Sequence, residues 1–221
     1  MDVVDAMAFF HSPEFFIQLS QSPLTAAHFD LKPANLLIDN DGSLVLTDFG
    51  DVRIVCKGER FETSGGDYNY GPPGSRKSVT WSQAYDVWSM ACVLTEIIEY
   101  IYQINGCDAV AKFRKNRRAD YRDSDNAFWI PRDGGRSFEI RPSVKKILGA
   151  FKIAEDPYLK EVTDLLERMF AVRESERPSM AQCSQRFAII FQNVTMDPYL
   201  TQYEGEIPIS DLGTKNPLRN M

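Results

Sequence analysis

Apolar residues recur at helical spacing in five stretches of the chain, and this pattern predicts most of the fold. The first stretch, residues 3–10, places Val3, Met7 and Phe10 on one face of a helix, which ends before Pro13. The other four stretches cover residues 87–98, 144–151, 159–169 and 180–190. Because the second stretch is apolar on nearly all sides, we expect it to be a helix buried in the core. The chain is therefore predicted to be mainly α-helical.

Two short apolar runs, at residues 36–38 and 44–46, are the clearest strand candidates. Residues 39–42, with the sequence Asp-Asn-Asp-Gly, separate them, and an Asp-Gly pair is a frequent turn of β-hairpins. We therefore expect one small hairpin. Between residues 58 and 78, seven glycines and prolines disfavour regular structure, so this segment is predicted to be one long loop, a kind of loop that is commonly functional.

The remaining segments are polar. Residues 103–140 are rich in charge, including a basic run at residues 112–118 that is followed by aspartates, and we expect a solvated insertion there. Residues 194–221 carry three prolines, two glycines and no clear period, which is typical of a flexible tail. The expected organisation is one domain over residues 1–193, which contains the insertion, and a tail after it.

Composition fits a folded protein and argues against several classes of partner. The chain has 221 residues, of which 43% are apolar and 25% are charged, enough for a buried core in one domain. Its net charge of −6 argues against a surface that attracts nucleic acid or an anionic membrane. The four cysteines form no CxxC pair, no run of 18 apolar residues occurs, and the first basic residue is Lys32. We therefore expect an intracellular, cytoplasmic protein with reduced thiols, no membrane span and no nucleic-acid partner.

Two short motifs flank the predicted hairpin. The sequence His-Phe-Asp-Leu-Lys-Pro-Ala-Asn occupies residues 28–35, and Asp-Phe-Gly occupies residues 48–50. In this order they resemble the catalytic loop and the DFG segment of eukaryotic-type protein kinases. Because six residue types match at fixed positions, the resemblance is specific.

The chemistry of phosphoryl transfer fits these motifs. It needs a carboxylate for the proton of the attacking hydroxyl, a cation near the transferred group and oxygen ligands for magnesium. The resemblance implies that Asp30 is the catalytic base and that Lys32 reaches the γ-phosphate of ATP. It also implies that Asn35 and Asp48 hold Mg²⁺, and that Leu37 packs under the adenine. A lysine two residues after the aspartate resembles the Ser/Thr branch, so the implied substrate is a serine or threonine hydroxyl of a protein.

Further matches extend the resemblance over roughly residues 3–192. Residues 86–91, Asp-Val-Trp-Ser-Met-Ala, look like the start of the family's buried F helix, where the aspartate holds the catalytic-loop backbone. Residues 176–179, Glu-Arg-Pro-Ser, look like the arginine segment before the last helix. His28 and Phe49 match the pair that stacks beneath the active site. The implied fold is mainly α with a small β-hairpin, a protein-kinase-like C-lobe.

The chain departs from the family pattern upstream of the catalytic loop. No glycine precedes Gly42 and no lysine or arginine precedes Lys32, although the family's glycine-rich loop and ATP-positioning lysine lie there. We therefore expect a C-lobe without an N-lobe, and impaired activity of this chain alone. Phe29 stands where most kinases carry the arginine that binds a phosphorylated activation loop, so control through that arginine is excluded.

A second departure lies in residues 70–74. Their sequence, Tyr-Gly-Pro-Pro-Gly, resembles the family's APE region, but a proline or a glycine replaces the glutamate. The usual partner, Arg177, would then lack an ion pair unless Asp67 or Glu62 substitutes, because an unpaired buried charge is costly. Gly66 and Asp67 are the nearest candidates for the threonine that bridges the catalytic aspartate and lysine in the family.

Two classes of function stay open at this point. The intact set of Asp30, Lys32, Asn35 and Asp48 favours a protein serine/threonine kinase that uses ATP and Mg²⁺. The missing upstream elements and the altered segment at residues 70–74 favour a non-catalytic, kinase-like module, a pseudokinase, that binds partners. Phosphate transfer by the chain would distinguish the two.

Overall fold

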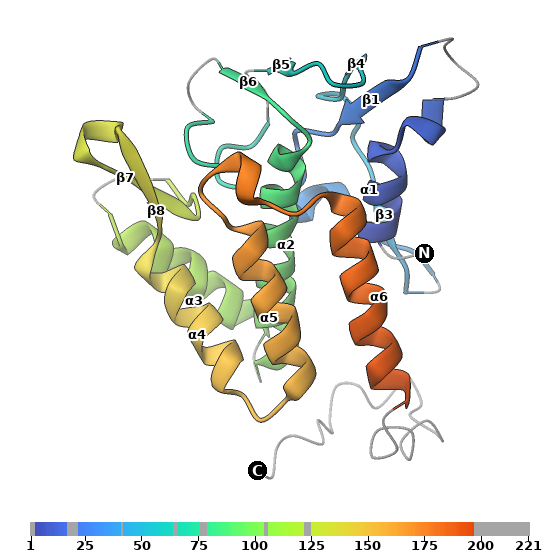
Figure 1. Ribbon diagram of the computed structural model, residues 1–221. Helices are drawn as coiled ribbons and strands as arrows, with labels where there is room; N and C mark the ends of the chain where they lie inside the picture. The colour runs from blue at the N-terminus through green and yellow to red at the C-terminus, as the bar shows by residue number, and fades with distance from the viewer. Residues whose placement is uncertain are drawn as a thin grey trace.

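A computed structural model describes residues 3–16, 22–40, 42–63, 66–75, 79–103, 106–121 and 125–196. These residues form six α-helices and eight short strands (Figure 1). The helices are α1 (Val3–His11), α2 (Ala84–Tyr102), α3 (Gly106–Ala119), α4 (Pro142–Ile153), α5 (Pro157–Met169) and α6 (Met180–Met196). The prediction of a mainly α-helical chain is confirmed, since each predicted helical stretch falls within one of these helices.

Helix α2 lies at the centre of the helical part of the molecule (Figure 1). It contacts α3 and α5, while α1 packs against α6. Every side chain from Tyr85 to Val93 is buried, as predicted for a helix that is apolar on nearly all sides. The ring of Trp88 packs edge-on against Phe170, with 5.1 Å between the ring centroids. The first half of α2 is therefore the core around which the other helices are arranged.

The predicted hairpin is present. Strand β2 (Leu36–Ile38) pairs antiparallel with β3 (Leu44–Leu46), and Leu36 lies opposite Leu46. In the turn, Gly42 has a φ of +85°, a left-handed conformation that glycine adopts without steric cost. The hairpin therefore joins the two kinase-like motifs in the way that the sequence predicts.

Three further antiparallel strand pairs are absent from the sequence prediction. They are β1 (Leu24–Ala27) with β4 (Arg53–Cys56), β5 (Phe61–Thr63) with β6 (Val79–Trp81), and β7 (Trp129–Arg132) with β8 (Ser137–Ile140). The prediction of a single loop over residues 58–78 is wrong at Phe61, which pairs with Trp81 and is buried against Phe29. Strands of three or four residues are too short to show a period, and their pairing partners in the folded protein decide them.

The prediction of a solvated insertion over residues 103–140 is also wrong. Helix α3 and the β7–β8 hairpin belong to this segment, and both Phe113 and Phe128 are buried in the main core. The guanidinium of Arg117 lies over both of these rings and pairs with Glu96 of α2 at 2.7 Å. A basic run can therefore enter a core when a buried carboxylate compensates one of its charges.

Helix α6 runs to Met196 and includes the first three residues of the predicted tail, 194–196. The rest of that segment, residues 197–221, lies outside the described part of the chain. No helix in the described ranges has both the length and the apolar character that crossing a membrane requires.

Candidate active site

The first turn of α2 holds the catalytic-loop motif. The carboxylate of Asp86 accepts backbone hydrogen bonds from His28 at 2.7 Å and from Phe29 at 2.9 Å, one on each oxygen. The imidazole of His11, at the end of α1, contacts the same carboxylate at 2.9 Å. Asp86 is fully buried, so water does not compete for these bonds. The expectation that this aspartate holds the loop backbone is confirmed.

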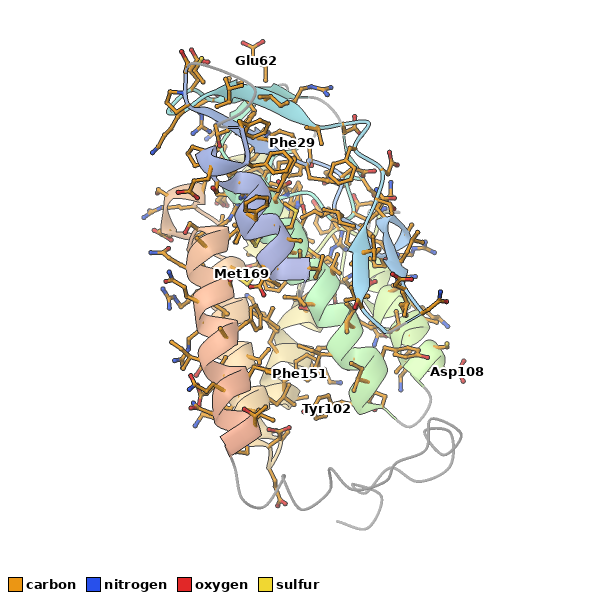
Figure 2. All side chains as sticks on the ribbon, turned by 90° about the vertical axis from the view of Figure 1, so that its right-hand side faces the viewer. Phe29, Glu62, Tyr102, Asp108, Phe151 and Met169 are labelled. Carbon is orange, nitrogen blue, oxygen red and sulfur yellow. The ribbon has the colours of Figure 1, made fainter. Side chains whose placement is uncertain are left out.

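Phe29 has an unusual backbone conformation within this loop. Its φ is 65°, in the left-handed region, which costs a residue other than glycine about 1–3 kcal/mol. The bond from its N–H to Asp86 and the burial of its ring against Phe61 and Tyr85 hold it there. The residue that replaces the usual arginine is therefore a core residue, close to the strands at one end of the molecule (Figure 2).

The structure brings Asp30, Lys32 and Asn35 together. Lys32 Nζ donates to Asp30 Oδ2 at 2.6 Å, and Asn35 Nδ2 donates to the same oxygen at 3.0 Å. Asn35 Nδ2 also donates to the backbone carbonyl of Asp30 at 2.9 Å. The hydrogen bond to Asp30 raises the pKa of Lys32, an ammonium group that is already charged at neutral pH. A carboxylate, a cation and an amide thus lie within hydrogen-bonding reach of one another.

The β2–β3 hairpin links Asp48 to Asn35. Thr47 donates to the backbone carbonyl of Asn35 through its N–H at 2.9 Å and through its hydroxyl at 3.1 Å. Asp48 follows at once, is exposed, and has a left-handed φ of 61°. Its Oδ1 accepts a long hydrogen bond of 3.4 Å from the N–H of Gly50. The two residues predicted to hold magnesium are therefore linked through Thr47, which makes two hydrogen bonds to the carbonyl of Asn35.

Asn35 and Asp48 fit a magnesium ion by their chemistry. Asn35 uses its Nδ2 for Asp30, which leaves the amide oxygen on the opposite edge of the group. In the described ranges, no three His, Cys, Asp or Glu side chains form a cluster that could hold a metal. Mg²⁺ suits such a sparse site, because it commonly takes one or two carboxylates and completes its shell with water and phosphate oxygens.

Aromatic rings support the DFG segment. The rings of His28 and Phe49 pack edge-on with 5.2 Å between centroids, and Phe10 of α1 lies 5.9 Å from Phe49. The predicted pairing of His28 with Phe49 is confirmed. Leu37, on β2, is 55% exposed and offers its side chain to an apolar ligand.

Gly66 and Asp67 both touch the catalytic loop. The N–H of Asp67 donates to Asp30 Oδ1 at 2.9 Å, so the second oxygen of this carboxylate is also held. A Cβ on Gly66 would lie 2.1 Å from the backbone oxygen of Phe29, and its φ of +90° disfavours any other residue. Asp67 therefore contacts Asp30 through its backbone, without the hydroxyl of the family's threonine.

Arg177 forms no ion pair with a carboxylate in the described residues. Its guanidinium lies over the ring of Trp88 and donates to three backbone carbonyls, those of Ala84, Ala171 and Val172. Burial lowers the pKa of Arg177 to about 10. Asp67 instead accepts hydrogen bonds from Asn69, and Glu62 is exposed on β5. The suggestion that one of these acids replaces the missing glutamate is therefore wrong: carbonyl oxygens and an aromatic ring surround this arginine.

Sequence reasoning misses the anchor of the segment at residues 66–75. The hydroxyl of Tyr70 donates to Glu96 at 3.0 Å, and Arg114 donates to both of them. Arg117 donates to the other oxygen of Glu96 at 2.7 Å. These partners are 18 to 44 residues apart in the sequence, so no spacing rule connects them. The one available signal is that Glu96 is the single acid within the apolar stretch predicted at residues 87–98.

Comparison with known proteins agrees with this geometry. The model of the protein kinase domain matches residues 2–187. The chain belongs to the protein kinase family. The serine/threonine-protein kinase Nek2 of Mus musculus is 33% identical over 138 residues, which cover 59% of this chain and 31% of that kinase. The serine/threonine-protein kinase nekl-2 of Caenorhabditis elegans is 25% identical over 179 residues, which cover 78% and 50%.

The range of the family match bears on the organisation of the chain. It includes every site residue described above and reaches into α6. The human Nek2 kinase is 33% identical over 131 residues, or 56% of this chain and 29% of that kinase. This kinase-family chain thus matches half or less of the length of each of these relatives.

Proposed function

We propose that this kinase-family chain transfers the γ-phosphate of ATP to a serine or threonine hydroxyl of a protein. The observation that carries the proposal is the set of contacts around Asp30. One oxygen accepts from Lys32 and Asn35, and the other accepts from the backbone of Asp67. A buried carboxylate held on both oxygens has a fixed orientation, which a catalytic base for the attacking hydroxyl requires.

Each site residue has a distinct part in this proposal. The hydroxyl oxygen attacks the γ-phosphorus, its proton passes to Asp30, and the bond from phosphorus to the bridging oxygen breaks to release ADP. Lys32, whose pKa is raised by its bond to Asp30, reaches the γ-phosphate as a cation. Asn35 and Asp48 would hold Mg²⁺, which neutralises phosphate charge when bound. Leu37 offers its exposed side chain to the adenine.

The proposal includes the assignment of α1–α6 to the helical C-lobe of a kinase. Its support is the central place of α2 and the attachment of the catalytic loop to Asp86 at the start of that helix. Leu37 and Phe49 each expose about half of their surface, 55% and 52%. A nucleotide and a covering lobe, from a longer chain or a partner, would bury this apolar surface. We therefore expect weak transfer by this chain alone.

A binding module without catalysis is the second candidate. The observation that favours it is the altered region at residues 70–74, which holds no acid, together with Arg177, which pairs with no carboxylate in the described ranges. In this case the kinase fold would bind partners or protein substrates without transferring phosphate. Both candidates predict a folded chain, so only activity and nucleotide binding separate them.

Phosphate transfer tests the first candidate. The full chain is incubated with Mg²⁺, γ-radiolabelled ATP and a generic basic protein as acceptor. We expect Asp30→Asn to lower transfer by at least about 100-fold, because it removes the base. The control is Asp39→Asn, an exposed aspartate in the hairpin turn, which should leave transfer unchanged. Transfer that survives Asp30→Asn would contradict the role of Asp30, and no transfer from the unmodified chain would favour the binding module.

Nucleotide binding tests the proposed metal ligands separately. Magnesium with ATP should raise the melting temperature of the full chain, because a ligand that binds only the folded state stabilises it. The Asp48→Ala variant should not respond, whereas Asp39→Ala should respond like the unmodified chain. An equal response of Asp48→Ala would remove Asp48 from the site, whatever the transfer assay shows.

A further inference from the structure

A cavity of about 450 Å³ lies between α2, α3 and α4, away from the catalytic loop. This volume is in the range of small-molecule sites. Glu99, in its wall, follows Asp86 by 13 residues on α2, or roughly 20 Å along a helix. In Figure 2, Asp108 of the same cavity lies toward the opposite end of the helices from Phe29. The cavity is therefore separate from the proposed kinase site.

Two buried polar atoms in the wall of this cavity have no hydrogen-bond partner in the described residues. They are Oε2 of Glu99 and Oγ of Ser143, whose residues are 6% and 8% exposed. A buried polar group without a partner costs about 1–3 kcal/mol, and a charged one costs more. Burial also raises the pKa of Glu99, and a hydrogen bond from Gln103 and the charge of Lys112 oppose this only in part. Both oxygens can accept a hydrogen bond from a donor group of a ligand.

The mouth of the cavity carries charges of both signs. Lys112 and Asp108 of α3 and Lys146 of α4 are exposed and line it. Between mouth and floor, Phe113 and Ile147 supply apolar wall. A ligand that satisfies all three zones has a cationic donor at one end, an alkyl stem, and both an anion and a cation at the other end.

We propose that this cavity binds a free basic amino acid. Its guanidinium or side-chain ammonium would donate to Glu99 and lie beside Ser143, and its alkyl stem would pack against Phe113 and Ile147. Its α-carboxylate would face the two lysines, and its α-ammonium would face Asp108. A simple polyamine fits less well, because its second cation can face Asp108 but it carries no anion for Lys112 and Lys146.

Calorimetric titration of the full chain with three related compounds tests the proposal. L-Arginine carries every proposed group, L-citrulline has the same shape with an uncharged head, and agmatine lacks the carboxylate. We expect L-arginine to bind and L-citrulline to bind about 10- to 100-fold more weakly, the loss that follows from one charged hydrogen bond. Agmatine should also bind more weakly than L-arginine. No heat with L-arginine at millimolar concentration, or equal affinities for L-arginine and L-citrulline, would overturn the proposal.

Matched variants assign the binding to this cavity. Glu99→Gln keeps the size of the side chain and should weaken the binding of L-arginine. The factor should equal that by which L-citrulline binds the unmodified chain more weakly than L-arginine does. Glu155→Gln, an exposed acid beyond the end of α4, should bind L-arginine normally. If Glu99→Gln does not fold by circular dichroism, Lys146→Gln tests the mouth and should weaken L-arginine but not agmatine. Unchanged L-arginine binding in a folded Glu99→Gln variant would contradict the site, and none of these outcomes depends on phosphate transfer.

Discussion

Two buried carboxylates on α2 hold neighbouring parts of the chain, and their partners differ. Asp86, in the first turn, accepts hydrogen bonds from the backbone N–H groups of the catalytic loop. Glu96, further along the same helix, binds the side chains of Arg114, Arg117 and Tyr70. Backbone amides are neutral and present in almost any sequence, whereas the partners of Glu96 are two charges and a phenol. The contacts of Asp86 therefore depend on the conformation of the loop, whereas those of Glu96 depend on particular side chains.

The charge of the partner decides what is lost when each carboxylate is removed. Without Asp86, two backbone N–H groups and the imidazole of His11 lose a partner, and each lost hydrogen bond costs a few kcal/mol at most. Without Glu96, the fully buried Arg117 keeps a positive charge with no carboxylate beside it. An uncompensated buried charge is the larger penalty. We therefore expect Glu96, which lies outside the sequence motif, to contribute more to stability than Asp86.

The largest expected effect is that of Glu96→Gln. The substitution keeps the shape of the side chain and removes its charge, so it should lower the free energy of unfolding by about 3–5 kcal/mol. Urea unfolding followed by circular dichroism measures this change.

Two controls separate the buried charge from the loss of any acid. Glu176 pairs with Arg173 in an exposed contact, so Glu176→Gln should cost less than about 1 kcal/mol. The double substitution Glu96→Gln with Arg117→Met should recover part of the lost stability, because it removes the unpaired cation. If Glu96→Gln and Glu176→Gln lowered the free energy of unfolding equally, the buried pair of Glu96 and Arg117 would contribute no more to stability than an exposed pair.

A smaller loss of stability is expected for a substitution at Asp86. Asp86→Asn replaces one acceptor oxygen with a donor, which leaves one N–H of His28 or Phe29 without a partner and should cost about 1–3 kcal/mol. Hydrogen exchange at these two amides should accelerate, because their bonds to α2 weaken. Asp164→Asn, an exposed residue of α5, is the control. Unchanged exchange at both amides would contradict the role of Asp86 as the anchor of the loop.

The comparison also explains how far the sequence predicts the site. Asp86 and the catalytic loop form a short motif whose contacts are mostly with backbone, so residue identity alone indicates their arrangement. The partners of Glu96 come from a run at residues 112–118 that has the composition of a solvated surface. Only the folded structure shows that Arg117 turns inward between two aromatic rings. Likewise, the resemblance names Gly66 only as a candidate neighbour of the catalytic aspartate and lysine, and only the structure shows that it lies against the backbone of Phe29.

The acid dependence of stability sharpens the assignment of Glu96. Burial opposes its ionisation, but hydrogen bonds from Arg114 and the charge of Arg117 outweigh burial and lower the pKa of Glu96 below its ordinary value of 4.5. Such a carboxyl stabilises the folded state fully above pH 4.5, and this contribution is lost as pH falls through the lower folded-state pKa. The stability difference between the unmodified chain and Glu96→Gln should therefore shrink below pH 4.5. A difference that stays constant from neutral to acid pH would contradict this.

The smallest expected effect is that of Tyr70→Phe. The hydroxyl is one of several donors to Glu96, and Arg114 and Arg117 keep the carboxylate paired after its removal. The loss of one hydrogen bond should lower the free energy of unfolding by about 0.5–1.5 kcal/mol in urea. Tyr100→Phe, at an exposed position of α2, should cost less.

Where Tyr70→Phe changes hydrogen exchange says more about the Glu96 cluster than the size of the stability loss. Tyr70 lies in the same segment as Asp67, whose N–H is bonded to Asp30. If the Glu96 cluster holds this segment against the catalytic loop, Tyr70→Phe should accelerate hydrogen exchange at Asp67 and leave His28, which Asp86 holds, unchanged. Faster hydrogen exchange at the amides of both Asp67 and His28 would mean that the Asp86 and Glu96 contacts act as one unit. It would contradict the difference between them proposed above.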